Sequence, residues 1–512
     1  MSISPVNEQI HNACRRLFLL VLLFLQISLT YANEPNLIAA VKNGDYEKIV
    51  SIIKQEADLN VRDTEGAAAM HWAVRRDNLQ VVEQLIQAGA DVNSANPYGV
   101  TPLWLACTNR NSAIIELLLT ARADPKAVLG TGESVLMNCV RTGTTKAVET
   151  LIKYDADVNS RESAKGQTAL MWSAAGNYPD ITKILIDNGA EIAATSNSGF
   201  TALLFAARSG DMESARILVK VGADPNEATV EHGNALLIAS ASGHDELALF
   251  LIAVGADINA EDINGLTPLH HAVRGGLALL NGVIYDAAYR TRPSNSLPLA
   301  TALLDSGANP NKQIKKSVLL GPDGAPFIME GSTPFLLAAA SADIPMMDLL
   351  LKFGADPGLV SVEKITPLIA AAQAACTGTC AYQGGGNVAR KQDVEKALMA
   401  VKNLVEAGAD VNQSDIRGRT AMHVAAFTGA DPVVQYLADH GAEVNVKNIY
   451  NETPWSMASG MSPLLENTGL YGKHDSTAAL LLKLGARPIP YEEIINPYAP
   501  VSGAGTPNKT SP

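Results

Sequence analysis

The stretch Gly89–Gly99, GADVNSANPYG, is followed directly by Val100–Ala106, VTPLWLA, and both phrases recur along most of the 512-residue chain. The third residue of each Gly-Ala-Asp triplet or close variant is Asp91, Asp124, Asp157, Glu191, Asp224, Asp257, Asn309, Asp356, Asp410, Glu443 or Arg487. Asp58, Asp91, Asp124 and Asp157 are 33 residues apart, and so are Asp224 and Asp257. A fixed period of this length indicates a repeat architecture.

The second phrase predicts the start of a helix. The hydroxyl group of Thr101 can cap free amide donors, and Pro102 at the first helical position lacks only an N–H that would stay unpaired. Ala106 is small enough to let a neighbouring helix approach closely. The Thr-Pro pair recurs at Thr267, Thr333, Thr366 and Thr453, with weaker starts at Ser134 and Asn234.

A second helix is predicted before each Gly-Ala-Asp. In VVEQLIQAG, Val81–Gly89, apolar residues recur at helical spacing. Gly89 is placed where a helix ends in a left-handed residue, and Gly99 closes the turn into the next unit. Two short helices and a turn cannot bury an apolar face alone, whereas stacked copies can. The sequence therefore predicts an all-α solenoid.

These units resemble ankyrin repeats, whose signature is a Thr-Pro-Leu-His start and a Gly-Ala-Asp-Val-Asn end. Thr267–His270 matches the start fully, while Ala69–His71 and Ala421–His423 match it loosely. The resemblance covers roughly residues 34–490, or about twelve stacked repeats. It implies a binding scaffold with a protein partner, no cofactor and no catalytic residues. The chain is similar to exported bacterial ankyrin proteins in which the array is the whole mature chain.

Residues 1–32 are predicted to be a signal peptide. Arg15 and Arg16 precede an apolar run, Leu17–Leu29, that is short for a transmembrane helix, and Thr30–Ala32 offers a cleavage site. An uncleaved anchor is the alternative. Cleavage would leave an exported chain, periplasmic or secreted, with no membrane insertion.

The repeats divide the chain further. A capping repeat is expected at 34–63, regular repeats at 64–262, and repeats with insertions at 263–490. The insertions are predicted at 275–298, 312–331, 376–397 and 460–476. The second of them is predicted to form a two-stranded finger. The insertions either bind a partner or are tolerated surface decoration. Residues 491–512 are Pro-rich and predict a disordered tail or a strap.

Charge and motifs exclude several classes of function. The net charge of −13 argues against nucleic acid and against an anionic membrane surface, because both attract Lys and Arg. An acidic surface either keeps a long molecule soluble or meets a cationic partner. The sequence contains neither a Gly-rich phosphate loop followed by Lys and Ser or Thr nor a nucleophile elbow. No enzyme activity, cofactor or metal site is expected.

The cysteines and histidines predict structural roles. Cys376 and Cys380, separated by Thr-Gly-Thr, are candidates for a disulfide in an oxidising compartment, with free thiols and a metal as the alternatives. Cys107 and Cys139 fall near the small-residue position of consecutive first helices and are expected to be buried packing thiols. The resemblance implies that His270 bonds its own turn.

The residue before the small Ala of each first helix forms a predicted stripe along the concave side of the array. The stripe is Trp72, Leu105, Asn138, Trp172, Phe205, Ile238, His271, Leu337, Ala370, Val424 and Met457. Candidate partner-binding residues are Trp72, Trp172, Phe205 and His271, together with Tyr285 and Phe327 from the insertions. The alternative is that stripe residues pack between helices, most of all Leu105, Ile238, Leu337 and Val424. Trp104 is expected in the core.

The function that follows is a non-catalytic protein-binding scaffold in the cell envelope, monomeric, that uses its groove, hairpin tips and inserted loops. One alternative is an accessory or inhibitory subunit of an exported enzyme. Another is a secreted effector that binds host proteins.

Overall fold

The computed structural model describes residues 37–55, 57–273, 295–316, 330–375, 391–461 and 473–495. The predicted signal peptide, Tyr285, Phe327, Cys376 and Cys380 lie outside the described residues. So do residues 496–512 of the tail and the greater part of the insertions. The chain divides into two compact units, Met1–Ser198 (unit 1) and Gly199–Pro512 (unit 2), which are described separately. This boundary precedes the loss of repeat regularity expected after residue 262.

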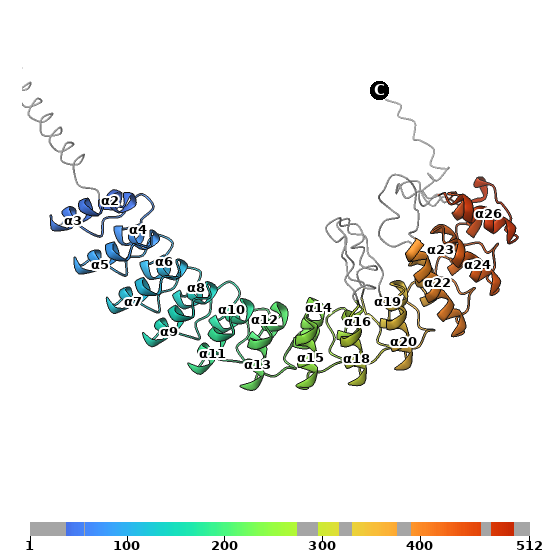
Figure 1. The fold of residues 1–512 in the computed structure, drawn as a ribbon, viewed down its shortest axis with the longest axis horizontal. Coiled ribbons are helices and arrows are strands. Elements are labelled where there is room, and N and C mark those ends of the chain that lie inside the picture. The colour runs from blue at the N-terminus through green and yellow to red at the C-terminus, as the bar shows by residue number, and fades with distance from the viewer. Residues whose placement is uncertain are drawn as a thin grey trace, which may run out of the picture. The chain divides into compact units, whose positions relative to one another are not determined.

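Unit 1 is a stack of helix pairs, and the all-α prediction is confirmed. In the order of the described chain, the pairs are α2 (Leu37–Asn43) with α3 (Tyr46–Lys54), α4 (Ala69–Arg75) with α5 (Leu79–Gln87), α6 (Pro102–Thr108) with α7 (Ser112–Thr120), α8 (Val135–Arg141) with α9 (Thr145–Lys153), and α10 (Ala169–Ala175) with α11 (Pro179–Asp187). The first helices of the pairs form one row and the second helices form another (Figure 1).

Unit 2 continues the same pattern. Its described pairs are α12 (Ala202–Ser209) with α13 (Met212–Lys220), α14 (Ala235–Ser242) with α15 (Asp245–Ala253), α16 (Pro268–Ala272) with α18 (Leu297–Asp305), α19 (Pro334–Ala340) with α20 (Ile344–Lys352), α21 (Pro367–Gln373) with α22 (Lys391–Glu406), α23 (Ala421–Phe427) with α24 (Asp431–Asp439), and α25 (Pro454–Ala458) with α26 (Asp475–Lys483). Two short antiparallel strands, β1 (Ala228–Thr229) and β2 (Gly233–Asn234), form one hairpin. The described residues thus hold twelve helix pairs, as the repeat count predicts.

The helix boundaries follow the predicted capping residues. The hydroxyl group of Thr101 accepts a hydrogen bond from the N–H of Trp104 at 3.2 Å. The weaker starts work in the same way, because Ser134 Oγ accepts from Met137 N at 3.2 Å and Asn234 Oδ1 from Leu237 N at 3.0 Å. Gly89 has a φ of 87°, a left-handed conformation that other residues adopt only at a cost.

An asparagine ladder joins consecutive repeats within each unit. In unit 1, Asn93 donates its Nδ2 hydrogen to the carbonyl oxygen of Arg122 at 3.0 Å, and its Oδ1 accepts from Asp124 N at 2.7 Å. The residues that make the same pair of bonds elsewhere are Asn159, Asn226, Asn259, Asn311, Asn412 and Asn445. Lys126 and Ala193 in unit 1 and Gly358 in unit 2 occupy the same position and have no side-chain amide.

The described parts of the insertions and tail differ in detail from the prediction. Helix α22 begins at Lys391, so the last residues of the predicted 376–397 insertion belong to a helix. Helices α18 and α26 likewise begin within the predicted insertions, at Leu297 and Asp475. The start of the tail forms a 3-10 turn, η2 (Tyr491–Glu493), and Ile495 donates its N–H to the carbonyl oxygen of Tyr450 at 2.9 Å. This described part of the tail therefore lies as a strap against the last hairpin.

Candidate partner-binding face

The predicted stripe is exposed to different degrees in the two units. In unit 1, Trp72, Leu105 and Trp172 are half-buried, while Asn138 is buried. In unit 2, His271 is half-buried, and the other stripe residues are buried: Phe205, Ile238, Leu337, Ala370, Val424 and Met457. Phe205 is only 4% exposed, so little of its ring is available to a partner. Trp104 is in the core, as predicted.

The indole of Trp72 is fixed by its surroundings. Its Nε1 hydrogen is donated to Asp63 Oδ2 at 2.9 Å, and the Lys42 ammonium pairs with the same oxygen at 2.9 Å. The Lys42 nitrogen also lies 4.0 Å from the centroid of the Trp72 ring, and the Arg75 guanidinium carbon lies 5.0 Å from it. Cations over an indole face are attracted by the ring quadrupole. Trp72 is therefore a pre-positioned aromatic group with its polar hydrogen already satisfied.

The carboxylate of Asp63 stays ionised at neutral pH. Burial favours its neutral form, but hydrogen bonds from Lys42, from Trp72 and from the backbone N–H groups of Ala67 and Glu65 outweigh burial and lower the pKa of Asp63 to about 2. The Asp63 side chain is 13% exposed and that of Lys42 is 38% exposed. The cation of this pair therefore faces solvent more than the anion does.

Trp172 repeats the arrangement with other partners. Its Nε1 hydrogen is donated to Gln167 Oε1 at 2.9 Å, and the Arg141 guanidinium carbon lies 5.9 Å from the ring centroid. Arg141 also pairs with Glu133 at 3.5 Å and donates to Asn138 Oδ1 at 2.7 Å. Burial raises the pKa of Glu133, although Arg141 opposes the shift. The side chains of Arg141 and Glu133 are 54% and 17% exposed, so here too the cation is outermost.

A pocket of about 540 Å³ opens beside Trp72, within the range of about 300–1,000 Å³ found for ligand pockets. Its lining residues are Thr64, Glu65, Ala67, His71, Trp72, Arg75, Asn96, Pro97, Tyr98, Val100 and Leu105. His71 is buried, accepts from Ala68 N through Nδ1 at 3.1 Å, and has Nε2 at 3.0 Å from the Val100 carbonyl oxygen. Burial lowers the pKa of His71, which keeps the imidazole neutral. The charged groups of the lining are thus Arg75 and Glu65.

We define the aromatic–basic face as Lys42, Trp72, Arg75, Leu105, Arg141 and Trp172, all on first helices of unit 1. Sequence reasoning found both tryptophans and missed the cations that stack on them. The signal was present, because α2, α4 and α8 each carry a basic residue in the last turn.

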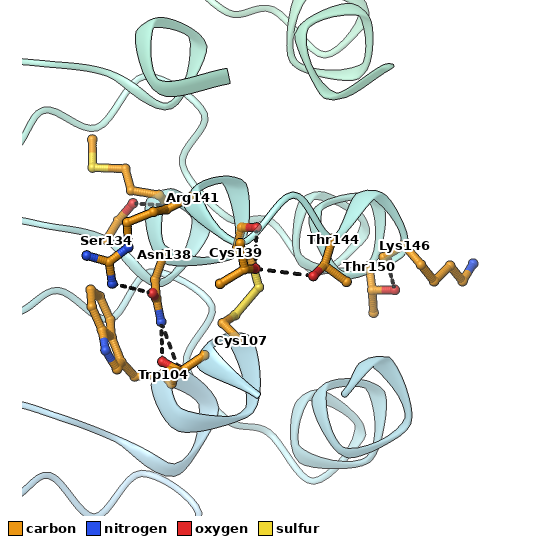
Figure 2. The surroundings of a disulfide bond; sticks show 12 residues. Trp104, Cys107, Ser134, Asn138, Cys139, Arg141, Thr144, Lys146 and Thr150 are labelled. Atoms are coloured by element: carbon orange, nitrogen blue, oxygen red, sulfur yellow. Dashed lines mark hydrogen bonds between the residues drawn. A yellow bond between two sulfur atoms is a disulfide. The ribbon is translucent and has the colours of Figure 1, made fainter. Parts of the chain in front are cut away.

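The prediction that Cys107 and Cys139 are packing thiols is wrong, because they form a disulfide. The bond joins α6 to α8, the two Cα atoms are 4.8 Å apart, and both residues are 0% exposed (Figure 2). A Cα separation of this size is normal for a disulfide. The physical reason is the stacking itself. Residues separated by 32 positions, close to the repeat step of 33, face each other on neighbouring first helices.

The same close-up shows a buried polar group within the stripe (Figure 2). Asn138 Nδ2 donates to the carbonyl oxygen of Trp104 at 2.9 Å, next to the disulfide. A buried amide of this kind needs its hydrogen bonds, and here Arg141 supplies one to the oxygen. Asn138 therefore holds the guanidinium of Arg141 in place rather than offering a free contact.

The histidines of the helix starts are structural, as the resemblance implied for His270. His270 Nδ1 accepts from Thr267 N at 3.1 Å, and His423 Nδ1 accepts from Thr420 N at 3.2 Å. Among the described residues, no group of three or more His, Cys, Asp or Glu side chains is placed to hold a metal ion. In the same ranges, no helix is long and apolar enough to cross a membrane.

Comparison with protein families agrees with this geometry. The family described as "Ankyrin repeats (3 copies)" matches residues 37–128, 111–196, 136–229 and 203–288. "Ankyrin repeats (many copies)" matches residues 404–458, and "Ankyrin repeat" matches residues 330–359. The chain belongs to the ankyrin repeat family. The paired helices of both units are therefore ankyrin repeats.

Individual relatives share only parts of this ankyrin array. Serine/threonine-protein kinase 12 of Arabidopsis thaliana is 41% identical over 71 residues, which are 14% of this chain and 15% of the kinase. Protein phosphatase 1 regulatory subunit 27 of Homo sapiens is 40% identical over 57 residues, 11% of this chain and 36% of that protein. Ankyrin repeat and SOCS box protein 16 of Homo sapiens is 29% identical over 150 residues, 29% of this chain and 28% of that protein. The chain thus spans well under two thirds of these relatives.

Among solved structures, the ankyrin repeat domain of Bcl-3 is similar, with a TM-score of 0.36 and 26% identity. The match covers 40% of this chain and 93% of that domain.

Proposed function

We propose that this ankyrin array is a non-catalytic protein-binding scaffold that works in an oxidising compartment outside the cytoplasm. The observation that carries the binding role is the aromatic–basic face. Two half-buried tryptophans have their indole N–H groups satisfied and their rings covered by cations. Tryptophan and arginine are the residues most enriched at the energetic centres of protein interfaces. Rings held in one position lose little entropy when a partner binds.

The disulfide supports the choice of compartment. Disulfides form and persist in extracellular and periplasmic proteins and are rare in the cytosol. Cys107 and Cys139 are fully buried between two repeats, so their bond is a structural one. It agrees with the signal peptide expected at residues 1–32, and we propose export to the periplasm or the medium. We expect the exported chain to be a monomer, which light scattering would test.

The binding role is tested by a pull-down from the cell envelope with the full chain as bait. The variant with Trp72→Ala and Trp172→Ala should lose the captured protein, while a control with Lys153→Ala on the second-helix row should retain it. Capture of a single stoichiometric enzyme would identify an accessory or inhibitory subunit. Capture of host proteins would identify a secreted effector. Equal capture by all three baits would contradict binding through this face. A bait without residues 317–329, the part of the predicted insertion 312–331 that lies outside the described residues, would then test the predicted finger.

The compartment is tested by alkylating thiols in cells that make the chain naturally. We expect the peptides that contain Cys107 and Cys139 to be recovered joined by a disulfide. Recovery of both cysteines in alkylated form, without prior reduction, would contradict export.

A further inference from the structure

In the aromatic–basic face, the cations are more exposed than the acidic residues that pair with them. The five first helices that the structure describes in unit 1 contain Lys42, Arg75 and Arg141 and no acidic residue. The acids that pair with Lys42 and Arg141, namely Asp63 and Glu133, come from the hairpins and are less exposed than their cations. At these two ion pairs, a partner that approaches the row of first helices meets the cation before the acid.

This arrangement is unexpected in a chain whose net charge is −13. Arg75 is exposed, lines the pocket, and stacks on Trp72. Glu65 is the one acidic residue among those that line the pocket, and it belongs to the hairpin rather than to the helices. An aromatic pocket with a guanidinium at its edge suits an apolar side chain that has a carboxylate as its neighbour, because arginine binds carboxylates through two parallel hydrogen bonds.

We propose that the partner of this scaffold presents an acidic segment, with an apolar side chain in the pocket beside Trp72 and carboxylates toward Arg75, Lys42 and Arg141. The proposal rests on the protein-binding function proposed above and specifies the chemistry of the partner. The pocket supplies apolar contact through Trp72, Leu105 and Tyr98, and Tyr98 is 77% exposed. The cations make this face positive, and a negatively charged partner complements it.

The test uses two labelled peptides with the same Leu and Phe residues, separated by glutamates in one and by lysines in the other. Fluorescence anisotropy with the full chain should show binding of the glutamate peptide that is at least about tenfold tighter than that of the lysine peptide, and that weakens as salt is added. Arg75→Glu should reduce binding of the glutamate peptide by about tenfold or more. Lys153→Glu, the same charge reversal on α9 in the second-helix row, should leave binding unchanged.

A charge swap makes the test specific. The variant with Arg75→Glu and Arg141→Glu should bind the lysine peptide better than the natural chain does, which a merely unfolded variant cannot do. Equal binding of both peptides by the natural chain would overturn the proposal, as would insensitivity to Arg75→Glu. Binding of neither peptide would also overturn it. The scaffold function is tested separately by the envelope pull-down, so the two can fail independently.

Discussion

Trp172 in unit 1 and Phe205 in unit 2 occupy the same position of a first helix, yet one is half-buried and the other is 4% exposed. An arginine lies beside both rings: the Arg208 guanidinium carbon is 4.9 Å from the Phe205 centroid, and that of Arg141 is 5.9 Å from the Trp172 centroid. The difference therefore lies in packing: first helices of unit 2 such as α19 and α21 are buried along their length except for Gln373, and they pack closely against the next repeat. The same repeat position is thus part of the surface at Trp72, Leu105 and Trp172 of unit 1 and part of the core at most repeats of unit 2.

The largest expected effect comes from truncating this position in both units. Phe205→Ala should destabilise unit 2 by about 3–5 kcal/mol, as removal of a buried aromatic ring does, whereas Trp172→Ala should cost clearly less because its ring is partly solvated already. Hydrogen exchange of the intact chain, read separately for peptides of each unit, measures both losses. Equal destabilisation by the two substitutions would remove the distinction between surface and core.

Acid should weaken unit 2 before unit 1. Burial lowers the pKa of His270 to about 3 and that of His423 to about 4, from 6.5. Burial also lowers the pKa of His474 in unit 2 and of His71 in unit 1. Because the folded state favours the neutral imidazole, these histidines contribute stability that is complete above pH 6.5. That stability is lost as the pH falls toward the folded pKa values. Each histidine contributes at most about 1.4 kcal/mol per pH unit, so His270 and His423 together could remove up to about 4 kcal/mol by pH 5.

Hydrogen exchange at pH 6.5 and pH 5, corrected for the intrinsic rate, checks this order. The contribution of Asp63 to folding stability does not change between pH 6.5 and pH 5, because a carboxyl group with a lowered pKa loses its stabilising effect only as the pH falls below 3.8. His270→Gln and His423→Gln should flatten the pH dependence of unit 2. Earlier loss of protection in unit 1 would show that the buried histidines do not control acid stability.

Removal of the disulfide should affect unit 1 alone. The bond closes a loop of 32 residues, which corresponds to about 3–4 kcal/mol in the chain-entropy account. The variant with Cys107→Ala and Cys139→Ala should therefore unfold in unit 1 at lower urea, and a reductant should not weaken it further. A variant with Cys376→Ala and Cys380→Ala is the control and should keep the full effect of the reductant on unit 1. If reductant leaves unit 1 of the natural chain unchanged, the disulfide does not stabilise the stack.

The smallest effect concerns the asparagine ladder. Lys126→Asn would supply the amide that unit 1 lacks between Asn93 and Asn159, and two new hydrogen bonds should add about 1 kcal/mol. Asn412→Ala in unit 2 should cost a similar amount, since its amide joins Gly441 and Glu443. The midpoint of urea unfolding, followed for each unit, is the measurement. No change from either substitution would mean that the ladder follows the stacking without stabilising it.

The stack of helix pairs could be predicted from the sequence because each repeat contains its own helix-capping residues. Thr101, Ser134 and Asn234 all cap helices as their local sequence indicates. Contacts between repeats were harder to predict. Cys107 and Cys139 are displaced by one residue within their repeats, so the period alone did not pair them. Of the two cations over Trp72, Lys42 comes from α2, one repeat earlier, and exposure of the stripe depends on neighbours that no single repeat encodes.

The most direct test of the account is photo-crosslinking from the aromatic–basic face in cells that make the chain naturally. A benzophenone amino acid in place of Leu105, which lines the pocket, should give an adduct with a partner protein. The same group in place of Lys153, on the second-helix row, should give none. Adducts from Lys153 but not from Leu105 would contradict recognition through the first helices of unit 1.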